Sequence, residues 1–319
     1  MAAKNDIHAP LVCPHCRTAL EATPDTLDCS QCRRKFPQSH GITDFSEGQY
    51  YDQEPGEAGL SAEQQAGLDH EISGTTARVE DFYGPLLDSE GARRARNAER
   101  PLRVLDSGCG NGLSIDLLND RGIEAWGNDI SALRKWQWQQ RERRDRLVVA
   151  DTRRLPFPDG YFDAVISSGV IEHIGVAETG GEHYTVEVLP ERDDARIAFL
   201  GELLRVLAPG GTFFLDCPNG AFPIDFWHGP KAGNARFHSL REGFLPTAGE
   251  IRRYVGEIGQ YTVRPMSPHG RLRMRQVGRH WYGQLFRIPM EALLQLMRLP
   301  PLRFLAASPL NPYLVLRIE

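Results

Sequence analysis

A glycine-rich segment, Gly108–Gly112, directly follows a short apolar run and is the most informative feature of the sequence. The run, Val104–Ser107, carries the acid Asp106 near its end, and the glycines allow the backbone to turn sharply and approach a ligand closely. A buried strand that breaks into such a turn is where nucleoside cofactors bind in a doubly wound sheet. A dinucleotide fingerprint would need its third glycine where Leu113 stands, and a carboxylate would repel a pyrophosphate. The turn therefore favours a cofactor that carries an ammonium and a sulfonium.

Further polar residues stand at the ends of the next predicted strands. Asp129 ends the segment 122–129, about 20 residues past the glycines, where a ribose diol is usually bound. Asp151 and Thr152 follow the apolar segment 147–150, and Ser168 ends the next one. Because the carboxyl ends of parallel strands form one crevice, we expect these side chains to converge there.

Four segments in this order resemble the motifs of class I S-adenosylmethionine-dependent methyltransferases of the type 11 kind: VLDSGCGNG, WGNDIS, ADTRRLPFPDGYFDAVISSGVIEHI and LLRVLAPGGTFFLDCPN. The resemblance runs from Pro101 to Asn219. It implies a Rossmann-like, doubly wound α/β fold with the mostly parallel, seven-stranded sheet of that family. The alternative is a nucleotide-type fold without methyl transfer, because such folds host many functions.

The resemblance also assigns the cofactor site, with the glycines at the methionine part, Asp129 at the ribose hydroxyls, and Asp151 with Thr152 at the adenine edge. The residues that it implies for binding S-adenosylmethionine are Asp106, Gly108, Cys109, Gly110, Asn111, Gly112, Asp129, Ile130, Asp151, Thr152 and Ser168.

Two C-x-x-C pairs near the N-terminus, Cys13 with Cys16 and Cys29 with Cys32, have the spacing of a zinc ribbon. Four thiolates make a closed tetrahedral site, so the predicted Zn²⁺ is structural. Disulfides or idle thiols are the alternative, but the first residues resemble no secretory signal, and we expect a cytoplasmic protein. Similar ribbons precede some methyltransferases, including ribosomal-RNA guanine methyltransferases, where they help to hold RNA.

Three histidines are candidates for the general base that removes a proton from an acceptor. His173 follows the predicted strand 162–168, which places it near the transferred methyl group, although it could instead serve helix packing or cofactor contacts. His228 and His238 lie in an aromatic-rich stretch after the strand 212–217, which suits a pocket for a cyclic or sugar-like acceptor. The aromatic rings of that stretch could equally cap the core.

Composition and order give the domain organisation. The chain has 319 residues, of which 41% are hydrophobic and 25% charged, and a formal net charge of −5. We expect a zinc ribbon over 1–45, a linker and lead-in helix over 46–100, and a methyltransferase domain over 101–319 in which 218–312 supply the acceptor pocket and C-terminal elements. Residues 175–194 are expected to form a loop, and no apolar run is long enough to span a bilayer.

The acidic total argues against broad nucleic-acid binding, which needs clustered Lys and Arg. Two basic clusters are present. The first, 134–146, is interpreted as the solvated face of a helix, and the second, 271–279, as a surface where an anionic acceptor could dock.

These observations predict an enzyme that methylates an oxygen of a small-molecule or carbohydrate-containing acceptor. An RNA base methyltransferase that uses the ribbon and the Arg271–Arg279 cluster is the second interpretation. The third is a non-catalytic scaffold that binds the cofactor for stability alone. The sequence does not indicate an oligomeric state.

Overall fold

The computed structural model describes residues 11–56, 59–94, 100–179, 184–229, 235–272 and 281–319. The contacts divide the chain into two compact units. The first unit takes in residues 1–76, 97–164 and 202–211, and the second takes in residues 77–96, 165–201 and 212–319.

The strands of the first unit lie in the order β1-β2-β3-β4-β7-β6-β5. Three of them, β5 (Arg103–Ser107), β6 (Glu124–Asp129) and β7 (Leu147–Val149), pair in parallel. Nearly every residue in these strands is buried, as is usual for parallel strands covered on both faces. They carry the strand-end acids that the sequence singled out.

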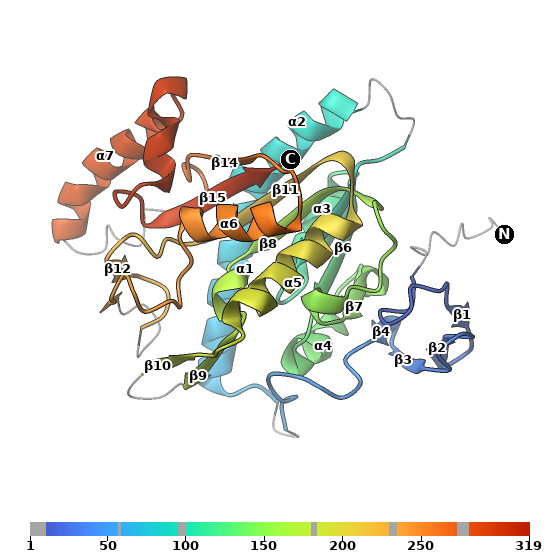
Figure 1. Ribbon diagram of the computed structural model, residues 1–319. Helices are drawn as coiled ribbons and strands as arrows, with labels where there is room; N and C mark the ends of the chain where they lie inside the picture. The colour runs from blue at the N-terminus through green and yellow to red at the C-terminus, as the bar shows by residue number, and fades with distance from the viewer. Residues whose placement is uncertain (1–10, 57–58, 95–99, 180–183, 230–234, 273–280) are drawn as a thin grey trace. The chain divides into compact units, whose positions relative to one another are not determined.

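The N-terminal ribbon is built from β1 (Glu21–Ala22), β2 (Thr26–Asp28), β3 (Lys35–Ser39) and β4 (Ile42–Asp44), which pair antiparallel in sequence order. Strand β4 then pairs in parallel with β7, so the ribbon continues the sheet of the first unit (Figure 1). Phe36 packs against Phe45, with ring centroids 4.7 Å apart. The ribbon is therefore attached through backbone hydrogen bonds and not only through a linker.

Helix α4 (Ala132–Trp138) of the first unit begins at a side-chain cap. The Ser131 hydroxyl accepts a hydrogen bond from the backbone N–H of Arg134 at the start of α4. Trp126, Trp138, Phe157 and Phe162 are among the largest buried side chains of the core. The helical segments are α1 (Ala62–Arg78, whose last two residues belong to the second unit), α3 (Leu113–Asp120), α4 (Ala132–Trp138), η2 (Arg144–Arg146) and η3 (Thr152–Arg154).

The second unit contains the end of β8 (Phe162–Ser168), most of β11 (Leu207–Pro218), β15 (Tyr313–Ile318) and β14 (Val263–Pro265), in that order. Strand β15 pairs antiparallel with both β11 and β14. The remaining pairs are β9 (Val176–Thr179) with β10 (Thr185–Val188), and β12 (Ile224–Asp225) with β13 (Arg236–Phe237). Its helical segments are η1 (Val79–Tyr83), α2 (Gly84–Arg94), η4 (Ile171–His173), α5 (Arg192–Val206), α6 (Ala248–Ile258), α7 (Trp281–Leu296) and η6 (Pro300–Ala307).

The predicted Rossmann-like α/β fold is confirmed, and the buried strands match the apolar segments from which they were predicted. The expected loop over 175–194 is wrong, because β9 and β10 form an antiparallel pair there and α5 begins at Arg192. The alternation in Thr185–Val188 is too short to be distinguished from a loop by composition. Within the described ranges, none of the helices is long and apolar enough to cross a membrane.

Candidate functional site

The glycine turn of the first unit has the backbone geometry that its sequence predicted. Gly108, Gly110 and Gly112 have positive φ angles of 76°, 56° and 75°. The N–H groups of Gly108 and Cys109 donate to the carbonyl of Asn128, at 2.9 and 3.0 Å, which ties the turn to β6. A Cβ atom on Gly112 would lie 2.8 Å from Leu147 Cδ1, so this position needs glycine for packing as well as for conformation.

Asp129 contacts this turn directly from the end of β6. Its Oδ2 accepts a hydrogen bond from Gly110 N at 3.0 Å, and its Oδ1 accepts one from Ile130 N at 2.8 Å. Burial raises the pKa of Asp129 to about 6, against the opposing charge of Arg134 and these two hydrogen bonds. The structure therefore brings Asp129, Gly110 and Ile130 together.

Asp106 and Asn111 both face the start of α3. The Ser114 hydroxyl donates to Asp106 Oδ2 at 2.5 Å, and Leu113 N donates to Asn111 Oδ1 at 2.9 Å. Both side chains are buried, so they hold the turn against the helix that follows it. The Cys109 side chain is also buried, close to Gly127.

Glu71 on α1 is a neighbour of the turn that sequence reasoning missed. Its Oε1 accepts a hydrogen bond from Asn111 N at 3.1 Å, and its Oε2 lies 2.7 Å from Arg134 Nη1. A Cβ atom on Gly110 would lie only 2.5 Å from Glu71 Oε1. Glu71 and Asp129 thus place two carboxylates at Gly110, and the guanidinium of Arg134 balances one of them, which leaves one negative charge to favour a cation. A contact across 40 residues of chain leaves no local signal in the sequence.

The residues expected at the adenine edge lie after β7. The Thr152 hydroxyl is 2.9 Å from Ser107 Oγ and accepts a hydrogen bond from Asn128 Nδ2 at 3.1 Å. Asp151 accepts hydrogen bonds from the side chain of Arg153, with Nη2 at 2.7 Å from Oδ2. Asp151 caps the short η3 helix through Arg153 N and remains partly exposed.

Ser168 belongs to a buried polar cluster of the second unit. Its hydroxyl donates to Asp216 Oδ1 at 2.8 Å and accepts from Arg271 Nη2 at 2.9 Å. Tyr83 and Tyr313 also donate to the Asp216 carboxylate. Burial would raise the pKa of Asp216, but the Arg271 guanidinium and these donors hold it below its usual value. Arg271 therefore neutralises a buried acid, and the part of its basic cluster from 273 to 279 lies outside the described residues.

A second group of candidates surrounds η4, which follows the carboxyl end of β8. His173 Nδ1 is 2.5 Å from Glu178 Oε1, and His228 Nδ1 is 3.0 Å from Asp225 Oδ2. The two imidazole rings are 5.1 Å apart between centroids, and both contact Phe244. Burial lowers the pKa of His173, but the Glu178 hydrogen bond and nearby carboxylates outweigh this effect and raise it overall.

His238 lies elsewhere in this region. Its Nε2 is 2.7 Å from the carbonyl oxygen of Phe222, and its Nδ1 is 3.2 Å from that of Ser239. Its side chain is almost fully buried, with contacts to the backbone instead of to the His173 and His228 rings. We therefore base the proposed chemistry on His173 and His228.

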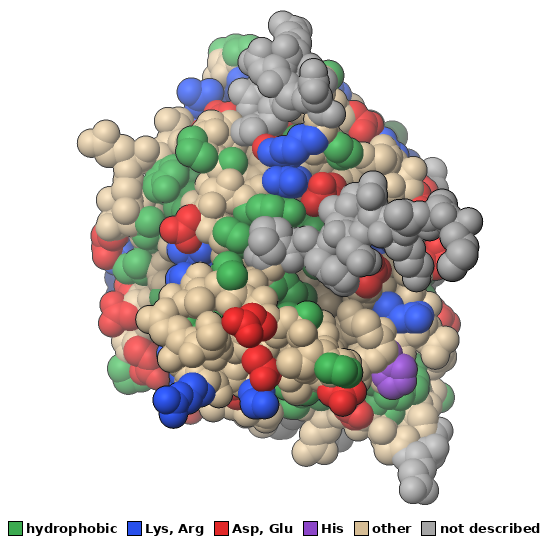
Figure 2. Space-filling view, turned by 90° about the vertical axis from the view of Figure 1, so that its right-hand side faces the viewer, with side chains coloured by type: hydrophobic (Ala, Val, Ile, Leu, Met, Phe, Trp, Pro, Cys, Tyr) green, Lys and Arg blue, Asp and Glu red, His purple; other side chains and the backbone are tan. Residues whose placement is uncertain are grey.

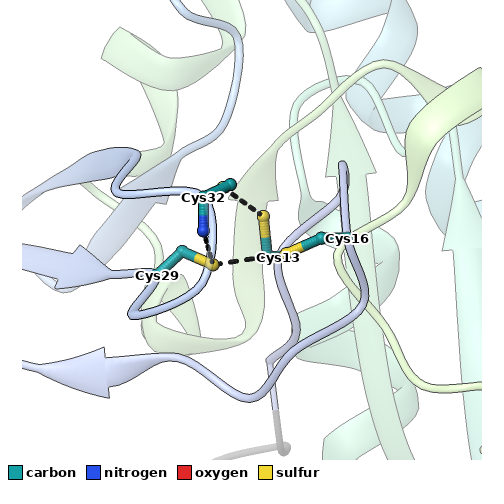
Figure 3. Close-up of side chains that lie close together, drawn as sticks. All are labelled: Cys13, Cys16, Cys29 and Cys32. Carbon is teal, nitrogen blue, oxygen red and sulfur yellow. Dashed lines mark hydrogen bonds between the residues drawn. The ribbon is translucent and has the colours of Figure 1, made fainter.

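The four ribbon cysteines come together in the first unit (Figure 3). All four Sγ atoms lie within 4.8 Å of one another, with Cys13 to Cys32 at 3.5 Å and Cys16 to Cys29 at 3.3 Å. A tetrahedral Zn²⁺ bonded to sulfur at about 2.3 Å keeps its sulfurs roughly 3.8 Å apart. The cluster therefore fits a structural zinc ion, and all four cysteines are free thiols.

The first basic cluster is bound to groups of its own unit. Lys135 Nζ is 2.7 Å from Asp44 Oδ2, and Arg141 Nε donates to the carbonyl of Asn111 at 2.8 Å. Arg144 Nε donates to the carbonyl of His40 at 2.9 Å. The expected solvated helix face over 134–146 is therefore wrong, because α4 ends at Trp138 and these basic side chains contact other groups of the first unit.

Residues 105–215 match a family model described as a methyltransferase domain. A probable S-adenosylmethionine-dependent methyltransferase of Mycolicibacterium smegmatis is 31% identical over 116 residues, 36% of this chain and 38% of the relative. A demethylmenaquinone methyltransferase of Beutenbergia cavernae is 33% identical over 125 residues, 39% and 42% of the two chains. An 18S rRNA (guanine-N(7))-methyltransferase of Bos taurus is 39% identical over 75 residues, which are 23% of this chain and 27% of the relative. The chain spans less than half the length of each of these relatives.

Proposed function

We propose that this chain, whose residues 105–215 form a methyltransferase domain, is an S-adenosylmethionine-dependent O-methyltransferase acting on a small-molecule or carbohydrate-containing acceptor. The observation that carries the cofactor assignment is the glycine turn with two carboxylates, Asp129 and Glu71, at Gly110. An anionic environment of this kind favours a cofactor whose reacting end is positively charged.

We assign different parts of the cofactor to different residues of this site. Asp129 would accept hydrogen bonds from the ribose hydroxyls, and its two backbone donors support this role because they fix its orientation. The glycines would let the backbone approach the methionine part of the cofactor, and residues 151–152 would bind the adenine edge. When bound, S-adenosylmethionine supplies an activated methyl group on its sulfonium, so the protein mainly aligns the reactants and excludes water.

The acceptor chemistry is assigned to the cluster around η4. A hydroxyl acceptor must lose a proton, and the His173 and His228 rings bring imidazole nitrogens and buried negative charge to one place. Tyr184 and Phe244 stack or pack against the rings and would contact a cyclic acceptor. This combination favours O-methylation of a hydroxyl group that is attached to a ring of the acceptor.

The ribbon is proposed to hold one structural Zn²⁺ through Cys13, Cys16, Cys29 and Cys32. Four thiolates leave no coordination position for water or substrate, so the ion would stabilise the ribbon without taking part in catalysis. Zinc binding through four thiolates would need reduced cysteines, which accords with the expected cytoplasmic location.

Two other functions compete with this proposal. RNA base methylation is favoured by the likeness to an rRNA methyltransferase and by the ribbon, but Arg271 is used internally and Lys135 is paired with Asp44. On the face shown in Figure 2, basic and acidic side chains are interspersed instead of forming one basic surface. A scaffold that binds the cofactor for stability alone would not explain why two carboxylates lie at the turn.

Calorimetric titration with S-adenosylmethionine, with NAD as the control ligand, tests the cofactor assignment. We expect binding of S-adenosylmethionine alone. Transfer of a labelled methyl group to a small-molecule fraction of a cell extract would then support the acceptor class, and label in RNA would favour the second interpretation. Failure of a folded, zinc-loaded protein to bind S-adenosylmethionine would contradict the cofactor assignment, whereas cofactor binding without any methyl transfer would favour the scaffold interpretation.

A further inference from the structure

Three potential metal ligands meet in the second unit, away from the ribbon cysteines. Glu172 and His173 come from η4, and His228 comes from the segment after β12. One ligand atom from each of these residues lies within 4.8 Å of the others. Two imidazoles and one carboxylate form a ligand set that binds divalent transition metals with coordination positions left open.

The carboxylate contacts of the two histidines match those of metal-bound imidazoles. His173 Nδ1 contacts Glu178, and His228 Nδ1 contacts Asp225, so Nε2 is left as the second nitrogen of each ring. In metalloproteins, a carboxylate on one ring nitrogen fixes the tautomer and strengthens the other nitrogen as a ligand. Tyr184 in turn donates to Glu178, which holds that carboxylate in place.

Glu172 provides an independent indication. Its side chain is 1% exposed, and its Oε2 has no hydrogen-bond partner among the described residues. An unpaired oxygen of a buried carboxylate is costly. A cation bound there would satisfy the oxygen that the protein leaves without a donor.

The surrounding charges also favour a cation. Three carboxylates, those of Glu172, Glu178 and Asp225, belong to the cluster or contact its histidines. Arg236 contacts Asp225 but is shared with Glu242. The buried guanidinium of Arg196 donates to the backbone carbonyls of Glu172, Ile174 and Phe244. Among these contacts, the carboxylates therefore outnumber the guanidinium groups that pair with them.

We propose that Glu172, His173 and His228 bind a divalent first-row transition-metal ion with at least one open coordination position. The inference deepens the proposed function, because an acceptor hydroxyl bound at that position would lose its proton more easily. The hydroxyl proton would leave to solvent, its oxygen would form a bond to the methyl carbon, and the carbon–sulfur bond would break to leave the thioether. The metal would not change its oxidation state.

Titration with Co²⁺ of protein that carries one equivalent of zinc, enough for the four ribbon cysteines alone, tests the site by visible absorption. The ribbon thiolates are then already occupied by zinc, and cobalt exchanged into them would be recognised by its thiolate charge-transfer band. We expect saturation at one additional equivalent without that band. Substitution of a ligand, as in His228→Gln, His173→Gln or Glu172→Gln, should weaken Co²⁺ binding by about tenfold or more.

Two exposed residues provide matched controls. His70→Gln on α1 and Glu187→Gln on β10 make the same chemical changes outside the cluster and should leave Co²⁺ binding unchanged. Circular dichroism of each variant checks that it is folded. Absence of saturable Co²⁺ binding by the folded wild-type protein, or undiminished binding by all three ligand variants, would overturn the proposal.

Titration of the same samples with S-adenosylmethionine separates the two proposals. Cofactor binding without cobalt binding would remove the metal site and leave the methyltransferase assignment intact. Cobalt binding at the cluster without cofactor binding would retain the metal site and remove the proposed reaction.

Discussion

At the residue scale, the clearest prediction concerns the carboxylate of Asp129. Asp129→Ala should weaken S-adenosylmethionine binding by about 1–3 kcal/mol, because the ribose hydroxyls and the backbone N–H groups of Gly110 and Ile130 would lose their acceptor. Calorimetric titration measures this difference directly. Asp120→Ala is the control, since Asp120 is a solvent-exposed acid that lies 3.8 Å from Arg143. Equal affinity of the Asp129→Ala variant and the wild-type protein would contradict the ribose assignment.

The same residue predicts a pH dependence. The pKa of Asp129 is raised to about 6, so the carboxyl becomes protonated as the pH falls through that value. A protonated carboxyl loses acceptor capacity for the ribose hydroxyls, so the affinity for S-adenosylmethionine should decrease below about pH 6. Calorimetry across this range should show a smaller change in Asp129→Asn, which has no proton to gain. Identical pH profiles for both proteins would exclude Asp129 as the titrating group.

Residues at strand ends could be predicted, whereas their distant neighbours could not. Asp129 was found because a polar residue after an apolar run marks the edge of a parallel sheet. Glu71 was missed because it comes from α1 and only tertiary packing brings it to Gly110, whereas Glu178 was missed because its segment was expected to be a loop and forms β9. Their immediate sequence neighbours contain no metal or nucleotide motif.

At the scale of an element, the glycine turn is the part that tolerates change least. Gly110→Ala would place a Cβ atom 2.5 Å from Glu71 Oε1 and hold alanine at a φ of +56°. The backbone strain alone costs about 1–3 kcal/mol. We expect a lower melting temperature and a loss of cofactor affinity, measured by calorimetry on the folded fraction.

The Gly122→Ala variant distinguishes the effect of backbone strain from the effect of a close contact such as that between Gly110 and Glu71. Gly122 has a φ of +79°, and no atom lies within 4 Å of the position that a Cβ would take, so its substitution adds strain without a close contact. It should lower the melting temperature but leave cofactor affinity unchanged. If both variants bound the cofactor equally well, the close approach of the turn to Glu71 would have no part in binding.

Sequence patterns were sufficient to predict the long buried strands but not the short or exposed ones. Long apolar runs such as Phe162–Ser168 predicted their strands because burial on both faces leaves a continuous signal. The hairpin of β9 and β10 was missed because its strands have four residues each and are largely exposed. The pairing of β4 with β7 was also missed, since register between distant strands depends on tertiary contacts.

For the first unit as a whole, the ribbon should contribute stability beyond its own residues. Strand β4 pairs with β7, Val12 N donates to the carbonyl of Pro156 at 3.0 Å, and Arg17 Nη2 lies 2.6 Å from Glu202 Oε1. Removal of zinc by a chelator should therefore lower the melting temperature and increase hydrogen exchange in residues 147–149, because metal binding and folding are coupled.

Two comparisons check that this effect is due to the metal. Restoring Zn²⁺ should recover both the melting temperature and the protection of β7. Cys13→Ser, which removes one of the four thiols, should behave like the chelated protein even when zinc is supplied. Unchanged exchange in β7 after zinc loss would mean that the ribbon unfolds independently of the sheet.

The charge distribution of the molecule leads to a prediction about RNA. The formal net charge is −5, Arg271 is bound to buried Asp216, and Lys135 is bound to Asp44. Each phosphate contact would need an available cation and would make affinity fall steeply with salt. We therefore expect no salt-sensitive retention of the protein on immobilised RNA, and no change when Arg273, Arg275 and Arg279 are replaced by alanine. Retention at low salt that is lost in this triple variant would instead identify that segment as an RNA-binding surface and favour RNA base methylation over the proposed O-methylation.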